Sequence, residues 1–250
     1  MRVAPNIYLV ASGAQGYSLT NDLDCNCWLV DAGGHFVLFD TGAGVGIDAI
    51  FDEMRDDGLA PEKLTHVFLT HAHGDHSGGA FEIKKRSGCQ VWCGELTAGL
   101  LAEGEDAISL GAARAAGVYP VDYIYNPPVP DAVFRPEAPI LIGTLKITPI
   151  VTPGHSLDHT SFLVEQATST ALVTGDAMLH SGRIIYHGTY DFDVGQSADS
   201  IRKLATLDFE VLLPGHGIFV RRGGRRHVDA AVAHLDQLKT PLAAEFVSIQ

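Results

Sequence analysis

The feature that most restricts what this chain can fold into is a run of metal-ligating side chains in residues 70–79, Thr-His-Ala-His-Gly-Asp-His-Ser-Gly-Gly. Three imidazoles and one carboxylate fall between His71 and His76, and these groups bind zinc or iron. Residues 66–70 form a short β-branched and aromatic run, which predicts a buried strand, and a polar helical segment follows Gly79. The run is therefore expected on a loop between a strand and a helix, where α/β proteins commonly carry their sites.

The order of the ligands within this run predicts two adjacent metal positions. His71 and His73 are two residues apart in an extended stretch, so their side chains face the same way, toward one metal. Gly74 lets the chain turn, and Asp75 and His76 then point toward a second metal. The alternative is a histidine-rich surface loop, which is disfavoured because a strand and several glycines frame the four ligands.

Composition restricts the class of protein and its partners. With 250 residues and 46% hydrophobic content, the chain can form one domain, 1–250, with a sizeable core. It has no apolar run of membrane-spanning length, and residues 1–6 do not resemble a signal peptide, so a cytoplasmic protein with no membrane partner is expected. The net charge of −13 argues against nucleic acid as a partner.

The cysteine pattern favours buried residues over a metal site. Cys25 and Cys27 alternate on an expected strand and face one side, and Cys89 and Cys93 are the other two. Such residues are expected to pack as small apolar side chains in a reducing compartment. A zinc site built from all four is the weaker alternative, because neither pair has the two-residue spacing of zinc knuckles.

Strand and helix patterns occur in two successive sets, with no linker between them. The main expected elements are a hairpin over 25–40, helices over 46–58 and 197–207, a strand over 143–151 and a terminal helix over 227–247. This order predicts a core of two sheets covered by helices on both outer faces, as one domain.

Residues 95–139 are expected to form a helical and loop insertion near the site. Two short helices precede an aromatic, proline-rich stretch, 119–130, which cannot be a central strand or helix. Tyr119, Tyr123 and Tyr125 are candidates to line the substrate pocket, with an apolar body and a polar tip. The alternatives, left open, are that these tyrosines pack in the core or that the segment forms a dimer contact.

Three further ligands follow expected strands in the second half of the chain. They are His155, Asp176 and His216, and a glycine precedes each, which allows close approach of the backbone to a metal. If these strand ends converge with the first run, seven ligands serve two metals. One position then has His71, His73 and His155, the other has Asp75, His76 and His216, and Asp176 bridges them through its two oxygens.

The ligand set resembles that of the metallo-β-lactamase superfamily, through the motif His71-x-His73-x-Asp75-His76 and the later His155, Asp176 and His216. The resemblance runs from about Ile7 to the end of the chain. It implies an α/β fold, an αββα four-layer sandwich with a dinuclear metal site at one edge. It also implies that Asp40, at the end of an early strand, supports the site from behind the metal ligands.

The pairing of Asp75 with His76 resembles the hydrolase branches of this family, including glyoxalase II and the acyl-homoserine lactonases. The tyrosine that lactonases carry after the bridging aspartate is absent from residues 177–180, and only residues 217–250 stand where glyoxalase II has a helical domain. The arginine-rich run 221–226 is either a solvated turn or a holder of an acidic substrate group. Of the remaining histidines, His159 is a candidate to support a ligand.

These features predict a dinuclear metallohydrolase of a small ester, lactone or thioester. A metal-bound hydroxide would attack the carbonyl carbon, and Asp75 would be the catalytic residue that takes the proton and passes it to the leaving group. The cofactors are two divalent metal ions, expected to be zinc, with iron or manganese as alternatives. The partner is a small acyl substrate, and a homodimer is left open.

Two other classes of protein are the alternatives. The first is an iron-dependent redox enzyme of the same fold, acting on a thiol or persulfide. The second is a non-catalytic binding protein that retains the fold. The complete ligand set favours the hydrolase over both.

Overall fold

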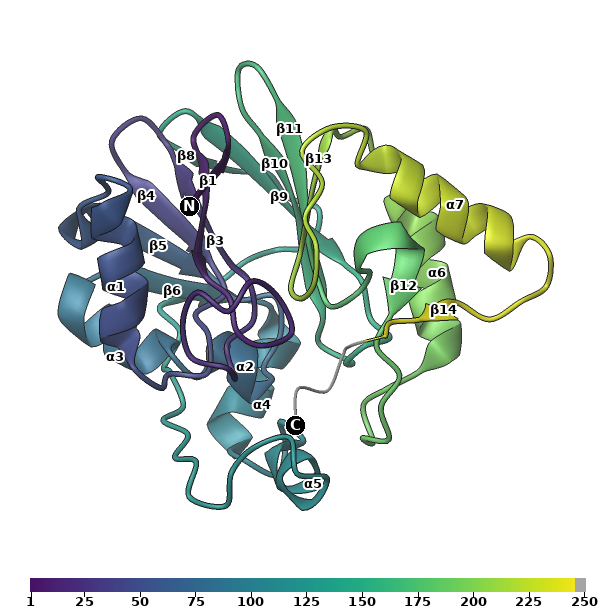
Figure 1. The fold of residues 1–250 in the computed structure, drawn as a ribbon, viewed down its shortest axis with the longest axis horizontal. Helices are drawn as coiled ribbons and strands as arrows, with labels where there is room; N and C mark the ends of the chain where they lie inside the picture. Colours follow the sequence, from purple (N-terminus) through teal and green to yellow (C-terminus); the bar gives the residue numbers. More distant parts are fainter. Residues whose placement is uncertain (246–250) are drawn as a thin grey trace. The chain divides into compact units, whose positions relative to one another are not determined.

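The computed structural model describes residues 1–245 and divides into two compact units, Met1–Phe134 and Arg135–Gln250. Each unit is built on its own β-sheet with helices beside it (Figure 1). The α/β class expected from the sequence is therefore confirmed, whereas a single domain over 1–250 stays a prediction.

The first unit contains a seven-stranded sheet in sequence order. Its strands are β1 (Arg2–Ala4), β2 (Ile7–Ala11), β3 (Cys27–Asp31), β4 (Phe36–Phe39), β5 (Leu64–Phe68), β6 (Gln90–Cys93) and β7 (Ala132–Val133). Neighbours from β1 to β4 are antiparallel, and those from β4 to β7 are parallel. Because parallel neighbours need crossover connections, the helices of this unit all lie after β4 in the chain.

The crossover helices bury one side against the sheet. They are α1 (Ile47–Asp56), the 3₁₀ turn η1 (Pro61–Lys63), α2 (Gly74–Ser77), α3 (Ala80–Ser87), α4 (Glu95–Glu103) and α5 (Leu110–Ala115). In α1, Ile50 and Met54 are buried at helical spacing and join one cluster with Leu38 of β4 and Val67 of β5. Figure 1 shows α1 and α3 along the same flank of these strands.

The second unit contains a five-stranded sheet in the order β13-β11-β10-β9-β8. The strands are β8 (Ile140–Ile142), β9 (Leu145–Val151), β10 (Thr160–Glu165), β11 (Thr170–Gly175) and β13 (Val211–Pro214). β8 to β11 pair antiparallel, and β11 pairs parallel with β13. The strands β9, β11 and β13 therefore run in one direction, and their carboxyl ends lie at the same edge of the sheet.

Two helices cover this sheet, and they are α6 (Val194–Leu204) and α7 (Arg225–Leu235). α6 begins at Asp193, whose side chain accepts a hydrogen bond from Gln196 N at 2.8 Å. Buried Ile201 of α6 and Val228 of α7 join Leu172 and Leu212 of the strands in one apolar cluster. Within residues 1–245, no helix has both the length and the apolar character needed to cross a membrane.

The terminal helix is shorter than the sequence analysis predicted. α7 ends at Leu235 rather than continuing over 227–247, and the last two residues of that range lie outside the described residues. Leu238, which a continued helix would place on the same side as buried Leu235 and Val228, is 97% exposed and has a φ of 59°. Pro241 cannot continue a helix, and β14 (Leu242–Ala243) instead pairs parallel with β12 (Arg183–Ile184), which follows the 3₁₀ turn η2 (His180–Gly182).

The strands of the first sheet are buried on both faces. Several residues that alternate with the helix-facing ones are aromatic, and Phe68, which has no exposed surface, contacts three of their rings. Its ring is stacked on Phe39 at 5.7 Å and tilted against Trp92 at 5.7 Å, with Phe134 at 6.3 Å between centroids. β5 thus anchors the loop that follows it through its packing on two sides.

Replacing Phe68 with alanine is expected to lower the free energy of unfolding by about 3–5 kcal/mol, because a ring buried on all sides leaves a cavity. Urea unfolding measures the change. Phe81→Ala on α3 is the matched control, since that ring is 45% exposed and its loss should change stability by about 0.5 kcal/mol or less. Equal losses for the two variants would contradict the central role of Phe68.

Candidate metal centre

The histidine-rich loop follows β5 and ends in a short helix that the sequence analysis did not predict. Residues 69–73 are irregular, and α2 (Gly74–Ser77) carries Asp75 and His76. Ser77 Oγ stabilises the turn by bonding to the carbonyl oxygens of Ala72 at 2.8 Å and His73 at 3.0 Å. The chain becomes helical at Gly74, so His71 and His73 lie on the irregular segment, whereas Asp75 and His76 lie on α2.

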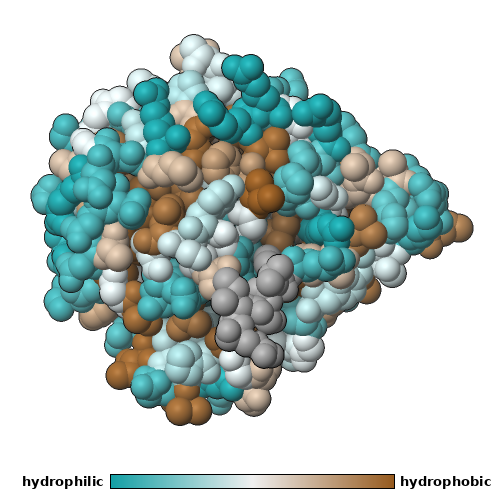
Figure 2. Space-filling model, viewed as in Figure 1, coloured by the Kyte–Doolittle hydropathy of each residue, from teal (hydrophilic) through white to brown (hydrophobic). Residues whose placement is uncertain are grey.

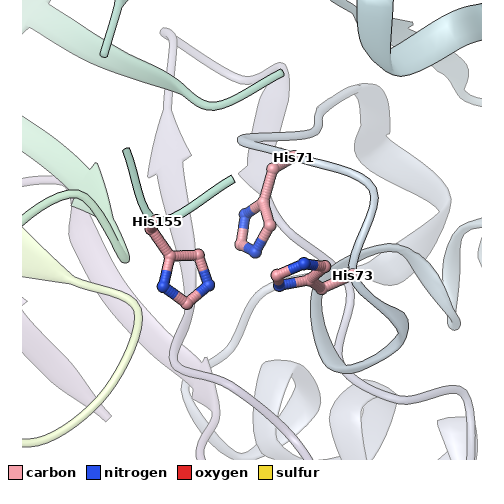
Figure 3. A group of neighbouring side chains, drawn as sticks. All are labelled: His71, His73 and His155. Atoms are coloured by element: carbon pink, nitrogen blue, oxygen red, sulfur yellow. The ribbon is translucent and has the colours of Figure 1, made fainter. Parts of the chain in front are cut away.

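Three imidazoles of this loop lie against one another within the first unit. The ring centroids of His71 and His73 are 4.5 Å apart, and Figure 3 shows the two rings turned toward each other. The centroids of His71 and His76 are 4.2 Å apart. His155, also drawn in Figure 3, belongs to the second unit. The three imidazoles of the motif therefore lie together in the folded loop, and their division between two metals stays a prediction.

The carboxylate of Asp40 lies behind these histidines and accepts three hydrogen bonds. Thr70 donates from its backbone N to Oδ1 and from Oγ1 to Oδ2, and His76 Nδ1 donates to Oδ2, each at 2.8 Å. Asp40 has a φ of 59°, a left-handed conformation that costs about 1–3 kcal/mol in a residue other than glycine. The three hydrogen bonds hold this strained residue at the end of β4, the position that the resemblance assigned to a supporting aspartate.

The same network selects the tautomers of two histidines. The Thr70 hydroxyl gives its proton to Asp40, so its oxygen accepts from Nδ1 of His71, at 2.9 Å. His76 likewise uses its Nδ1 proton toward Asp40. Assigned in this way, both rings carry a proton on Nδ1, and the neutral tautomer with that proton has its lone pair on Nε2, the atom that would bind a metal ion.

Asp75 and His76 present ligand atoms at a suitable separation. Asp75 Oδ2 lies 3.6 Å from His76 Nε2. Two such ligands on one tetrahedral zinc ion are roughly 3.4 Å apart, given metal–ligand bonds of about 2.0–2.2 Å. The other oxygen, Oδ1, accepts a hydrogen bond from the hydroxyl of Tyr119 at 2.8 Å. The donor atoms thus fit a shared divalent ion.

Cys25 is a neighbour of this network that the sequence analysis did not foresee. Its Sγ, a carboxylate oxygen of Asp40 and a ring nitrogen of His76 all lie within 4.8 Å of one another. Burial raises the pKa of the Cys25 thiol well above its usual value, and the Sγ of Cys27 lies 3.7 Å away. All four cysteines are buried thiols, as expected, and Cys25 packs here as a neutral thiol.

The second unit brings His155, Asp176 and His216 together at the carboxyl edge of its sheet. They follow β9, β11 and β13, whose common direction puts these strand ends side by side. Asp176 Oδ2 is 3.5 Å from His155 Nε2 and 3.4 Å from His216 Nε2, and all three residues are buried. Oδ2 thus faces both imidazoles, and the bridging role through both oxygens of Asp176 stays a prediction.

Close packing beneath His155 requires the glycine before it. Gly154 has a φ of 139°, and a Cβ there would lie 2.4 Å from the backbone N of Ser197 on α6. Gly154 O also accepts a hydrogen bond from Asp193 N at 2.8 Å, next to the start of α6. The glycine therefore allows the loop of His155 to pack against α6. The sequence pattern relates this glycine to close approach of the backbone to a metal.

His159 supports Asp176 in the second unit as Asp40 supports His76 in the first. Its Nε2 accepts a hydrogen bond from Asp176 N at 3.0 Å, so the ring is neutral with its proton on Nδ1. That proton goes to Thr152 Oγ1 at 2.9 Å, and the Thr152 hydroxyl in turn donates to Ser161 Oγ at 2.9 Å. This chain of donors holds the backbone that carries Asp176.

Residues 119–125, here called the tyrosine strap, pack against the histidine-rich loop. Tyr119, Tyr123 and Tyr125 are each about 5–6% exposed and belong to the apolar core of the first unit. Their hydroxyls bond to the loop and its surroundings, at Asp75 for Tyr119, at Ala43 O and Gly74 O for Tyr123 and at Ser77 Oγ for Tyr125. Of the alternatives left open, core packing describes these tyrosines.

Burial and the negative charge of Asp75 both affect the pKa of Tyr119 in the tyrosine strap. Burial, and after it the charge of Asp75, raise the pKa of Tyr119 well above its usual value. The Tyr119 hydroxyl therefore stays a proton donor. Val121 and Ile124 of the strap are 94% and 76% exposed, on either side of exposed Asp122. Figure 2 shows hydrophobic and hydrophilic atoms side by side along the lower edge of the first unit.

Comparisons with known proteins agree with the resemblance. The family model of the metallo-beta-lactamase superfamily matches residues 20–216. This chain belongs to that superfamily. One solved neighbour is a metallo-beta-lactamase with a HARLDQ motif from Cronobacter sakazakii, with a TM-score of 0.71 and 17% identity over 95% of this chain and 96% of that one. Another is the metallo-beta-lactamase GOB-18 from Elizabethkingia meningoseptica, with a TM-score of 0.68 and 19% identity over 86% of this chain and 76% of that one.

Curated relatives are similar over most of this chain. "Lactamase-like protein nscB" from Arthroderma benhamiae is 30% identical over 199 residues, which cover 78% of this chain and 36% of the relative. "Lactamase-like protein adaB" from Aspergillus niger is 28% identical over 194 residues, covering 77% of this chain and 49% of the relative. The chain thus spans less than two thirds of the length of these relatives. The metallo-β-lactamase fold expected from the resemblance is confirmed.

Asp40→Asn is expected to weaken zinc binding about 10–100-fold, because the amide offers one acceptor oxygen in place of two and either Thr70 or His76 loses its acceptor. Competition with a chromogenic chelator measures the affinity. Asp31→Asn is the control, since that carboxylate bonds to Gly33 N and Gly34 N in the β3–β4 turn. An unchanged affinity in Asp40→Asn would show that His76 does not need this partner.

Proposed function

We propose that this chain is a hydrolase that uses two divalent metal ions to cleave the acyl bond of a small ester, lactone or thioester. The observation that carries the proposal is the orientation of the motif histidines. His71 and His76 are held through Nδ1 by Thr70 and Asp40, so each ring would bind a metal ion through Nε2.

The ligands are proposed to divide between two positions. His71, His73 and His155 would hold one ion, and Asp75, His76 and His216 the other, with Asp176 between them. Support comes from each unit separately, because the ligand-atom separations of 3.6 Å in the first and 3.4–3.5 Å in the second suit shared ions. A set of imidazole and carboxylate donors favours zinc, with iron or manganese as alternatives.

Bound ions of this kind supply a water nucleophile near neutral pH and polarise a carbonyl group. The protein supplies proton transfer and orientation. Asp75 is proposed to accept the proton of the attacking water and to pass it to the leaving oxygen or sulfur. Asp40 and His159 keep the ligands in place before substrate arrives, so little reorganisation is needed during the reaction.

The proposed substrate is small and not polyanionic. A net charge of −13 disfavours nucleic acids and other chains of phosphates. The solved neighbours are metallo-beta-lactamases by title, so a cyclic amide belongs in the same comparison as esters, lactones and thioesters. The pairing of Asp75 with His76 favours the oxygen and sulfur esters, as in the hydrolase branches that the motif resembles.

The test is a hydrolysis screen of lactones, thioesters, aryl esters, a β-lactam and phosphodiesters on protein of measured metal content. Turnover of an acyl ester with zinc bound supports the proposal. An iron-containing protein with visible absorption and thiol oxidation, or a metal-loaded protein with no turnover of any acyl substrate, would overturn it.

His71→Ala and Asp176→Ala are each expected to lower kcat/KM by about 10³-fold or more, or about 4 kcal/mol of transition-state stabilisation, because each removes a metal ligand. Chelation should abolish turnover, and added zinc should restore it. His35→Ala in the exposed β3–β4 turn is the matched control and should retain full activity. Activity that persists in metal-free protein would contradict metal-dependent hydrolysis.

A further inference from the structure

We propose that Tyr119 is a positioning residue for Asp75, whose carboxylate it holds so that one oxygen faces the metal ligands. The inference rests on the proposed function, in which Asp75 binds a metal ion and transfers a proton. It adds a residue that lies well beyond the ligand motif in the chain, in the tyrosine strap.

One hydroxyl contacts Asp75 twice. Tyr119 Oη donates to Asp75 Oδ1 at 2.8 Å and accepts a hydrogen bond from Asp75 N at 2.9 Å. The donor and acceptor capacities of the hydroxyl are thereby both used on a single residue. These two bonds join the side chain of Asp75 to its own backbone through Tyr119.

The second carboxylate oxygen of Asp75, Oδ2, faces the ring nitrogen of His76. With Oδ1 engaged by Tyr119, Oδ2 lies 3.6 Å from Nε2 of His76. The last torsion of an aspartate side chain is broad, so a carboxylate without such a partner samples a range of orientations. Tyr119 therefore restricts the carboxylate of Asp75 to the orientation in which its Oδ2 and Nε2 of His76 can share an ion.

The strap gives Tyr119 a rigid base. Its ring stacks on Tyr123, with centroids 4.8 Å apart and planes at 20°, and Tyr123 Oη donates to Ala43 O at 2.7 Å. Gly74 completes the contact, since a Cβ there would lie 3.3 Å from the hydroxyls of both tyrosines. A side chain at position 74 would push the tyrosines away from the loop.

Tyr125 offers a matched comparison within the same strap. It is buried like Tyr119, and its hydroxyl also bonds to α2, but its partner is Ser77 Oγ at 2.8 Å. Ser77 keeps its bonds to Ala72 O and His73 O when that hydroxyl is removed. Tyr125→Phe thus reproduces the loss of a buried hydroxyl without touching Asp75.

The experiment measures two stepwise zinc affinities, by competition with a chromogenic chelator, for wild type, Tyr119→Phe, Tyr125→Phe, Asp75→Ala and the double variant Tyr119→Phe/Asp75→Ala. Thermal unfolding of the metal-free proteins checks folding. Tyr119→Phe is expected to weaken one zinc position about 10–100-fold and to leave the other unchanged, as for partners that orient metal ligands. Tyr125→Phe should leave both affinities unchanged, and Tyr119→Phe should cause no further loss in the Asp75→Ala background.

Three results would overturn the proposal: equal affinities for Tyr119→Phe and Tyr125→Phe, an equal loss from Tyr119→Phe with and without Asp75, or a wild type that binds fewer than two zinc ions. If Tyr119→Phe does not fold, wild type carrying a ¹³C-labelled tyrosine at position 119 replaces it. Its ring resonance should shift as the second zinc position fills, and a resonance that does not move would also overturn the proposal. These measurements use no substrate. If the variants show the expected zinc affinities but the hydrolysis screen finds no turnover, only the proposed function is rejected.

Discussion

The hydrogen bonds received by Asp40 are the interaction on which the first half of the site depends. One buried carboxylate bonds to the backbone and hydroxyl of Thr70 and to the ring of His76, and through Thr70 it also orients His71. A carboxylate is acceptor-only, so it forces each partner to be a donor. The proton on Nδ1 of both histidines, and the assignment of Nε2 as the atom that would bind a metal ion, follow from that single property.

The second unit reaches a comparable result with a different residue. There His159 accepts the backbone N–H of Asp176, and a threonine and a serine complete the chain of donors. The strands β9, β11 and β13 run in one direction, so three candidate ligands from separate parts of the chain meet at one sheet edge. In both units a buried acceptor fixes a ligand-bearing segment that would otherwise be an irregular loop.

Much of the candidate site could be predicted from the sequence, because its candidate ligands are either clustered in the chain or marked by a preceding strand and glycine. Four ligands fall in six residues after β5, and the other three each follow a strand and a glycine. Some residues that contact those candidate ligands or Asp40 could not be predicted from the sequence pattern. Tyr119 and Cys25 lie far along the chain from the motif, and nothing in their spacing indicates that they meet Asp75 or Asp40. The proline-rich segment is a loop, as predicted, and its tyrosines follow the alternative of core packing that the sequence left open.

By itself the sequence determined the α/β class, the ligand types and the strand ends that carry them, because periodicity and ligand chemistry are local properties of the chain. Tertiary structure decided where α7 ends, since the pairing of β14 with β12 and the turn at Leu238 compete with a continued helix. It also decided that one oxygen of Asp176 faces two imidazoles and that Tyr119 holds Asp75. Those are distances between segments remote in sequence, and only the packing of the sheets and the strap sets them.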